Sequence, residues 1–251
     1  SLPIQFIHCY ALFSYFTGMF TMLITIAGYC WLCRQPLRYG NHSICSSCIR
    51  HLPQQNNRCP GCLYPSTHSM ILCGRCLRSP PRWKQMLTVT DYRPPLNKLL
   101  HLYKYHPRPQ IALCLAKLFL LRWLAHRREN LVRKPEQIIS VPLHRHRRWR
   151  RGFDQVEAIA KPLARWLNCP YHPNTLIRTR ATLAQTHLNA KQRQQNLDNA
   201  FIVNRTVSVA GKDLALIDDV ITTSATLNAI VPLLFRAGAR SVEVWAICRT
   251  L

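Results

Sequence analysis

The stretch LALIDDVITTSAT, residues 214–226, decides the fold of this chain. Its four apolar residues predict a short buried strand, and two adjacent carboxylates, Asp218 and Asp219, stand at the carboxyl end of that strand. A hydroxyl-rich loop leads from there into a predicted helix, which Gly238 is expected to end, and residues 242–247 predict the next strand. A strand, a helix and a strand joined this closely predict a parallel sheet flanked by helices, an α/β fold.

The same stretch predicts a binding site for a sugar phosphate. Ligands bind such sheets outside the carboxyl ends of the strands. Backbone N–H groups at a helix N-terminus can hold a phosphate together with Thr hydroxyls. Asp218 and Asp219 can accept hydrogen bonds from sugar hydroxyls, or hold a cation through water. A ribose 5-phosphate satisfies both halves, with its diol on the carboxylates and its phosphate on the loop.

The residues before this stretch predict further helices and strands. Asp154 is expected to cap a helix, because Glu157 three residues on completes a capping-box-like start. The other predicted elements are a short segment 96–105, a helix 109–128, a strand 137–141, the capped helix 154–167, a short strand 175–177 and a polar helix 191–197. The expected apolar face of the helix 109–128 comprises Ile111, Leu115, Leu118 and Leu121.

Four CxxC pairs precede the α/β region, separated by 11, 10 and 10 residues. Each pair can form a knuckle that offers two thiolates, and two knuckles complete a tetrahedral zinc site. We expect two structural zinc sites with the knuckles paired in sequence, although spacing leaves a cross-braced pairing open. A disulfide framework is the alternative, but it needs an oxidising compartment. The predicted ligands are Cys30, Cys33, Cys45, Cys48, Cys59, Cys62, Cys73 and Cys76.

The role of these zinc sites is structural, because four thiolate ligands leave no open coordination position. Residues 34–84 carry eight basic side chains and no acidic one. This segment is therefore either a contact surface for nucleic acid or protein, or a stabilising cap on the domain that follows.

The chain is strongly basic. Its 251 residues carry 34 Lys+Arg against 10 Asp+Glu, a formal net charge of +24, and 48% of them are hydrophobic. So apolar a composition excludes a disordered basic tail. The charge predicts a polyanionic partner: nucleic acid, a phosphorylated small molecule or an anionic membrane face.

One basic segment lies close to the predicted site. Residues 144–151 carry five Arg and two His, and they follow a predicted strand that ends near the same edge of the sheet. This loop is interpreted as a clamp for pyrophosphate or a nucleic-acid backbone, with a solvated basic loop as the alternative. The possible contacts are Lys104, Arg148, Arg150 and Arg151; an exposed Lys without a ligand is the other interpretation of Lys104.

The N-terminal segment is apolar. Residues 1–33 carry no charged side chain, and residues 9–27 have about the length that spans a bilayer. A secretory signal would begin with basic residues, which are lacking here. We favour an upstream extension from an early start, with the natural start at Met19 or Met22, and a membrane-spanning segment remains the alternative.

Several of these motifs together resemble one protein family. IDDVITTSAT (217–226) is similar to the motif with which type I phosphoribosyltransferases bind 5-phosphoribosyl 1-pyrophosphate (PRPP). With four knuckles before it, and with RRGFDQ (150–155) and residues 178–201 in between, the chain resembles the ComF/GntX group, and most of all its GntX branch. The resemblance implies a type I phosphoribosyltransferase-like parallel sheet flanked by helices, preceded by a small double zinc-ribbon module.

The resemblance also implies roles for individual residues. Asp218 and Asp219 would be the catalytic pair that binds the ribose hydroxyls, and magnesium would arrive with PRPP. Two residues depart from the group: Ser224 stands where Gly is usual, and Asp154 stands where Asn is usual, which we interpret as a helix cap. The residues implied to wrap the 5′-phosphate are Thr222, Thr223, Ser224, Ala225 and Thr226.

The function implied is that of a cytoplasmic PRPP-binding protein in the uptake or nutritional use of DNA, with pentosyl transfer from PRPP as the reaction class. The alternative is a non-catalytic, zinc-ribbon adaptor that binds nucleic acid. PRPP is the expected partner, with single-stranded DNA or the DNA-uptake machinery second. We divide the chain into an apolar extension (1–29), a double zinc ribbon (30–78) and a phosphoribosyltransferase-like domain (79–251).

Overall fold

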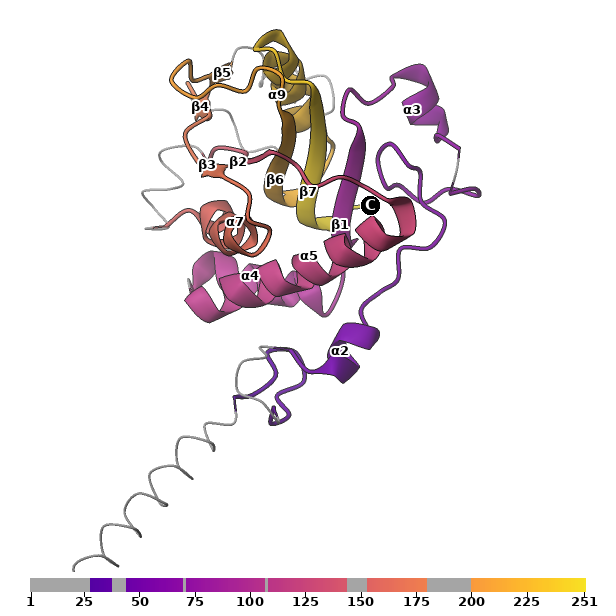
Figure 1. Ribbon diagram of the computed structural model, residues 1–251. Helices are drawn as coiled ribbons and strands as arrows, with labels where there is room; N and C mark the ends of the chain where they lie inside the picture. Colours follow the sequence, from indigo (N-terminus) through magenta and orange to yellow (C-terminus); the bar gives the residue numbers. More distant parts are fainter. Residues whose placement is uncertain (1–27, 38–43, 70, 107, 144–152, 180–199) are drawn as a thin grey trace, which may run out of the picture. The chain divides into compact units, whose positions relative to one another are not determined.

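The computed structural model describes residues 28–37, 44–69, 71–106, 108–143, 153–179 and 200–251 (Figure 1). The chain divides into two compact units, one that ends at Arg50 and one that comprises His51–Leu251. The first unit contains the short helix α2 (Ser46–Arg50) and an isolated bridge between Tyr29 and Pro36. The division falls between the second and the third cysteine pair, whereas the domain bounds 30–78 and 79–251 follow the sequence motifs and stay a prediction.

The second unit is built on a five-stranded sheet with the order β1-β7-β6-β2-β3, and every pair of neighbours is parallel. β6 and β7 are buried along most of their length, as expected for parallel strands covered on both faces. A separate antiparallel pair joins β4 (Leu176–Arg178) to β5 (Phe201–Val203). The strands of the sheet are β1 (Gln85–Asp91), β2 (Gln137–Ser140), β3 (Tyr171–His172), β6 (Asp213–Ile221) and β7 (Ser241–Arg249).

Helices cover both faces of this sheet. α9 packs on one face, where its Ile230 and Leu234 meet Leu216 and Val244, and α4, α5 and α7 lie on the other (Figure 1). On that second face the rings of α5 surround Trp245 of β7, with Phe119 at a centroid distance of 5.1 Å. The bounds are α3 (Gly74–Arg78), α4 (Leu96–Tyr105), α5 (Pro109–Asn130), α7 (Gln155–Trp166) and α9 (Ala225–Arg236).

The predicted fold class is confirmed: a parallel sheet flanked by helices, with two four-cysteine clusters before it. Asp154 caps α7 as predicted, since its Oδ1 accepts hydrogen bonds from the N–H groups of Val156 (3.0 Å) and Glu157 (3.1 Å). One expectation is wrong: Leu121 is 51% exposed, because it lies just outside the helix face that Ile111, Leu115 and Trp123 bury.

Two further expectations concern segments outside this description. The polar helix predicted at 191–197 lies outside the described residues, as does nearly all of the apolar segment 1–29. Among the helices that the structure does describe, none has the length and apolar character needed to cross a bilayer. The choice between an upstream extension and a membrane-spanning segment therefore stays a prediction.

Candidate sugar-phosphate site and metal centres

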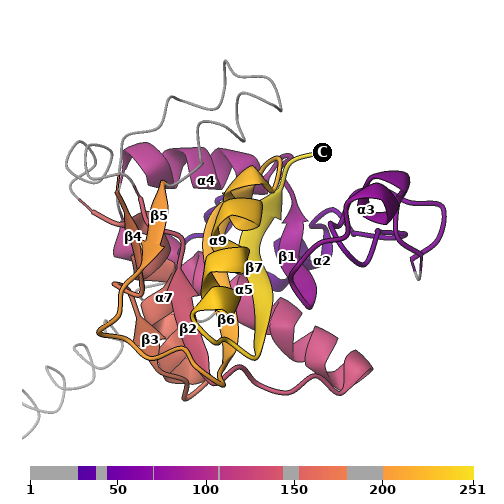
Figure 2. The same cartoon turned by 90° about the horizontal axis from the view of Figure 1, so that it is seen from above.

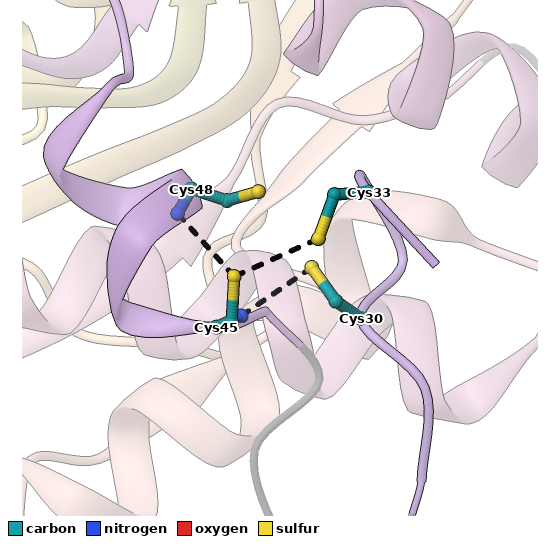
Figure 3. Close-up of side chains that lie close together, drawn as sticks. All are labelled: Cys30, Cys33, Cys45 and Cys48. Carbon is teal, nitrogen blue, oxygen red and sulfur yellow. Dashed lines mark hydrogen bonds between the residues drawn. The ribbon is translucent and has the colours of Figure 1, made fainter. Parts of the chain in front are cut away.

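The cysteines of the four CxxC pairs form two groups of four, and within each group all Sγ atoms lie within 4.8 Å of one another. The sequential pairing of the knuckles is thus confirmed. The Sγ atoms of Cys33 and Cys45 are 3.7 Å apart (Figure 3), as are those of Cys62 and Cys73. A tetrahedral zinc ion with Zn–S bonds of about 2.3 Å spaces its sulfurs by about 3.8 Å, so both groups fit this ion.

The thiols of each group are unequal. Burial opposes the ionisation of Cys30, but the backbone N–H groups of Cys33 and Cys45 lower its pKa to about 6. Burial likewise opposes the ionisation of Cys73, whose pKa is nevertheless lowered to about 7 by the backbone of Cys76 and the neighbouring thiols. Each group therefore presents a thiolate near neutral pH, and a divalent cation is the charge that lets the remaining thiols ionise.

The two carboxylates lie in the last part of β6, and strand alternation turns them to opposite faces of the sheet. Asp218 lies on the same face of β6 as Leu214 and Leu216, which pack against α9. Asp219 lies on the opposite face, towards α4 and α7. Asp219 is 9% exposed, and its Oδ2 lies 3.2 Å from Nζ of Lys104. Asp218 therefore lies on the side of α9, while Asp219 lies on the side of the Lys104 ammonium.

Asp218 is a weaker acid than an ordinary aspartic acid. Burial and the charge of Asp219 hold the pKa of Asp218 well above its ordinary value. Its Oδ1 accepts a hydrogen bond of 2.8 Å from the N–H of Asp219. A diol or a cation would supply the stabilisation that the ionised carboxylate lacks.

Two helices deliver side chains to Asp219. Lys104 stands in the last turn of α4, which lies at the carboxyl-end edge of the sheet (Figure 2). Gln155, the first residue of α7, donates a hydrogen bond from Nε2 to Oδ2 of Asp219. Tyr103 ties the two helices together, because its hydroxyl donates to the Gln155 carbonyl over 3.2 Å. Lys104, a possible pyrophosphate contact in the sequence analysis, lies beside Asp219, and its contact with pyrophosphate stays a prediction.

The loop 222–224 connects β6 to α9 and carries the predicted phosphate-binding residues. Ser224 adopts the left-handed conformation, with φ of 60°, and its side chain makes no capping hydrogen bond within the described chain. Such a φ is easy for Gly and strained for other residues. The Thr223 hydroxyl is buried without a hydrogen-bond partner among the described residues. The loop therefore holds a polar atom that nothing in the described protein satisfies.

Sequence reasoning missed Gln155 and Arg249 as residues of this region. Gln155 belongs to RRGFDQ, so that motif was the available signal. Arg249 ends β7 at 1% exposure and donates from Nη1 to the carbonyls of Ile221, over 3.2 Å, and Thr222. No pattern marks Arg249, because its partners are backbone atoms. The other predicted contacts, Arg148, Arg150 and Arg151, lie outside the described residues.

No protein-family model matches the chain. It is 46% identical over 229 residues to the DNA utilization protein YhgH of Shigella flexneri, a match that covers 91% of this chain and 100% of that protein. It is 35% identical over 225 residues to competence protein F of Haemophilus influenzae, covering 88% and 96%. Among solved structures, the glutamine PRPP amidotransferase of B. subtilis is similar with a TM-score of 0.36 and 26% identity, over 58% of this chain and 30% of that one.

Proposed function

Since the chain belongs to the ComF/GntX family, together with the DNA utilization protein YhgH and competence protein F, we propose that it binds PRPP and acts in the uptake or nutritional use of DNA. The reaction class proposed is pentosyl transfer, in which a nitrogen nucleophile displaces pyrophosphate at C1′ of the ribose. The proposal places this action in the cytoplasm, because thiolate clusters persist in reducing compartments.

The observation that carries the proposal is the junction of β6 and α9. Two carboxylates with incomplete charge compensation come directly before a loop that buries an unpartnered hydroxyl, that of Thr223. The loop opens a helix of 12 residues, whose N-terminal dipole favours an anion. A ligand that brings a diol and a phosphate in one molecule meets each of these needs.

Each side chain has a defined task in this proposal. Asp218 and Asp219 accept hydrogen bonds from the ribose hydroxyls and so fix the sugar ring relative to the loop. Residues 222–226 hold the 5′-phosphate. Magnesium, bound by the pyrophosphate of PRPP, would neutralise charge on the leaving group. Lys104 holds Asp219 in place before the ligand arrives. Positioning and charge neutralisation are then the main contributions of the protein.

Calorimetric titration of the zinc-loaded protein with PRPP and Mg²⁺ tests this proposal. The parent chain is expected to bind, and the Asp218→Asn/Asp219→Asn variant is expected to lose about 100-fold in affinity, because hydrogen bonds to two charged acceptors are weakened. Asp213→Asn is the matched control, since it changes the same residue type on the same strand at the opposite end of the sheet. That control is expected to bind PRPP like the parent.

The same samples distinguish the adaptor hypothesis. A parent chain that ignores PRPP but binds single-stranded DNA, with an affinity that falls steeply as salt rises, would contradict the proposal. Adjacent carboxylates at the site argue against that outcome, since a surface that binds only DNA has no use for them. Equal PRPP affinity in the parent and the double variant would show that PRPP binds elsewhere.

A further inference from the structure

Arg249 connects the second four-cysteine cluster to the phosphate loop. Its Nε donates a hydrogen bond of 2.9 Å to the carbonyl oxygen of Cys62, a predicted zinc ligand. Its Nη1 donates to the carbonyls of Ile221 and Thr222, where β6 passes into the loop. One planar, buried guanidinium therefore bridges two backbone segments that lie far apart in the sequence, and both belong to the same compact unit.

The charge of Arg249 points to the metal. Within the described chain, no carboxylate forms an ion pair with this guanidinium; Asp91, its neighbour in the sheet, pairs with Arg58 at 2.5 Å. Burying an uncompensated cation is costly. Four thiolates around one Zn²⁺ carry a net charge of about −2, and Cys62 belongs to that group. A loaded zinc site therefore supplies the counter-charge that Arg249 otherwise lacks.

The cluster is also packed firmly at this point. Trp83, just before β1, donates from Nε1 to the carbonyl of Gly61 over 2.7 Å. Gly61 leaves no space, because a Cβ there would lie 2.8 Å from Cγ of Pro81. The knuckle that contains Gly61 and Cys62 is thus held by two side-chain donors, one on each of two successive carbonyls. A movement of the knuckle backbone therefore displaces the Cys62 carbonyl, which is the acceptor of the Arg249 hydrogen bond.

We propose that Arg249 is a positioning residue that couples zinc occupancy of the second cysteine cluster to the conformation of the phosphate loop. With zinc bound, the knuckle presents its Cys62 carbonyl, Arg249 is held in place, and the carbonyls of Ile221 and Thr222 fix where the loop begins. Without zinc, Arg249 loses its counter-charge and the loop loses its anchor. The consequence for PRPP rests on the proposed function; the coupling of zinc to the loop does not.

The two clusters provide a matched pair of variants. Cys45 and Cys73 are counterparts: each lies 3.7 Å from a thiol of the preceding knuckle, and each donates its N–H to the first thiol of its cluster. Hydrogen exchange of residues 220–226 is measured in the full zinc-loaded chain as parent, Cys45→Ser, Cys73→Ser and Arg249→Lys. Lys keeps the charge of Arg249 but cannot reproduce its fork of donors.

Exchange in the loop is expected to rise about tenfold in Cys73→Ser and in Arg249→Lys, and to stay at the parent level in Cys45→Ser. The double variant Cys73→Ser/Arg249→Lys is expected to show no further rise, since both changes remove one connection. Equal loop exchange in Cys45→Ser and Cys73→Ser, or additive effects in the double variant, would overturn the proposal.

A second measurement covers the case in which Cys73→Ser does not fold, because Arg249→Lys keeps all eight cysteines. In a Cys45→Ser background, zinc release to a chelator reports the second site alone. Arg249→Lys is expected to accelerate this release, and PRPP is expected to slow it about fivefold with Arg249 but not with Lys, because a ligand that orders the loop also holds the knuckle through Arg249. Release that is unchanged by Arg249→Lys contradicts the coupling. If PRPP has no effect on zinc release, while Arg249→Lys still changes loop exchange and zinc release, only the proposed function is contradicted.

Discussion

β6 carries aspartates at both of its ends, and the pKa values of these aspartates shift in opposite directions. At the amino end, Asp213 accepts hydrogen bonds from Nε (2.9 Å) and Nη2 (2.6 Å) of Arg240 and from the Ser241 hydroxyl (2.7 Å). These donors, with Arg240 first, lower the pKa of Asp213 to about 2. At the carboxyl end, burial and Asp219 raise the pKa of Asp218 well above its ordinary value.

This difference agrees with the proposed function, in which the ligand binds at the carboxyl end. At the amino end, Asp213 and Glu136 are both paired with Arg240. The carboxyl end gathers buried polar groups at the ends of four strands, Asp91, Ser140, Asp219 and Arg249, and the Thr223 hydroxyl in the loop beyond them is buried without a hydrogen-bond partner among the described residues. Folded proteins tolerate such unmet groups mainly where function requires them.

The largest effect is expected from Asp218→Asn, which removes the repulsion between the two carboxylates. An acid whose folded pKa is raised destabilises the folded state once the pH exceeds its unfolded value of 3.8. The variant should therefore gain about 1–3 kcal/mol at pH 7, while its Oδ1 still accepts from the Asp219 N–H. Thermal unfolding at pH 7 and pH 3 checks this, because the gain should vanish at pH 3. A loss of stability at pH 7 would remove the contrast between the ends of β6.

The left-handed residues extend the comparison to the backbone. The loops before β6 and β7 use Gly211 (φ 68°) and Gly238 (φ 93°), whereas the loop after β6 uses Ser224 (φ 60°). Ser224→Gly should stabilise the unit by about 0.5–1 kcal/mol. Gly238→Ser should destabilise it by at least about 1 kcal/mol, because a Cβ would lie 3.1 Å from Cβ of Ala210.

Denaturant unfolding of these two variants gives the signs directly. PRPP titration adds a second reading, since Ser224→Gly also removes a Cβ from the loop and should tighten binding, whereas Gly238→Ser should leave affinity unchanged. If Ser224→Gly instead weakened PRPP binding, the conformation of Ser224 would be required by the site.

The smallest effect is expected from Asp213, whose partners lie partly in solvent. Its lowered pKa contributes stability above about pH 4, and this contribution is lost as the pH falls from 3.8 towards 2. Asp213→Asn should lower the thermal midpoint at pH 7 by no more than about 2 °C. The difference from the parent should shrink as the pH falls towards 2, and salt should reduce the difference at pH 7. A larger, salt-independent loss would mean that the amino end is more than a screened surface network.

Much of the fold could be predicted because local signals agree with the tertiary structure. The apolar run before Asp218, the Asp154 cap and the Gly238 helix end each depend on neighbours in the sequence, and each is confirmed. The zinc ligands could also be predicted from the sequence, because the two thiols of a knuckle are separated by only two residues. β1 was not predicted, although its residues 85–91 carry the β-branched residues typical of a strand.

The site was predictable only in part, since its remaining contacts join distant segments. Lys104 meets Asp219 through the packing of α4 at the sheet edge, and no spacing in the sequence encodes that ion pair. Arg249 binds carbonyl oxygens, which every residue has, so its role leaves no compositional trace. Ser224 is the intermediate case: its departure from the usual Gly was visible, but its positive φ was not.

The two donors to Asp219 have a consequence for the proposed binding of a ligand. Its Oδ2 already receives the Lys104 ammonium, at 3.2 Å, and the Gln155 amide. A ribose hydroxyl that takes this oxygen must enter by exchange, and it sets Lys104 free to approach a phosphate. Under the proposed function, binding then substitutes one ion pair for another, so Lys104 has one partner in the free protein and a different partner in the complex.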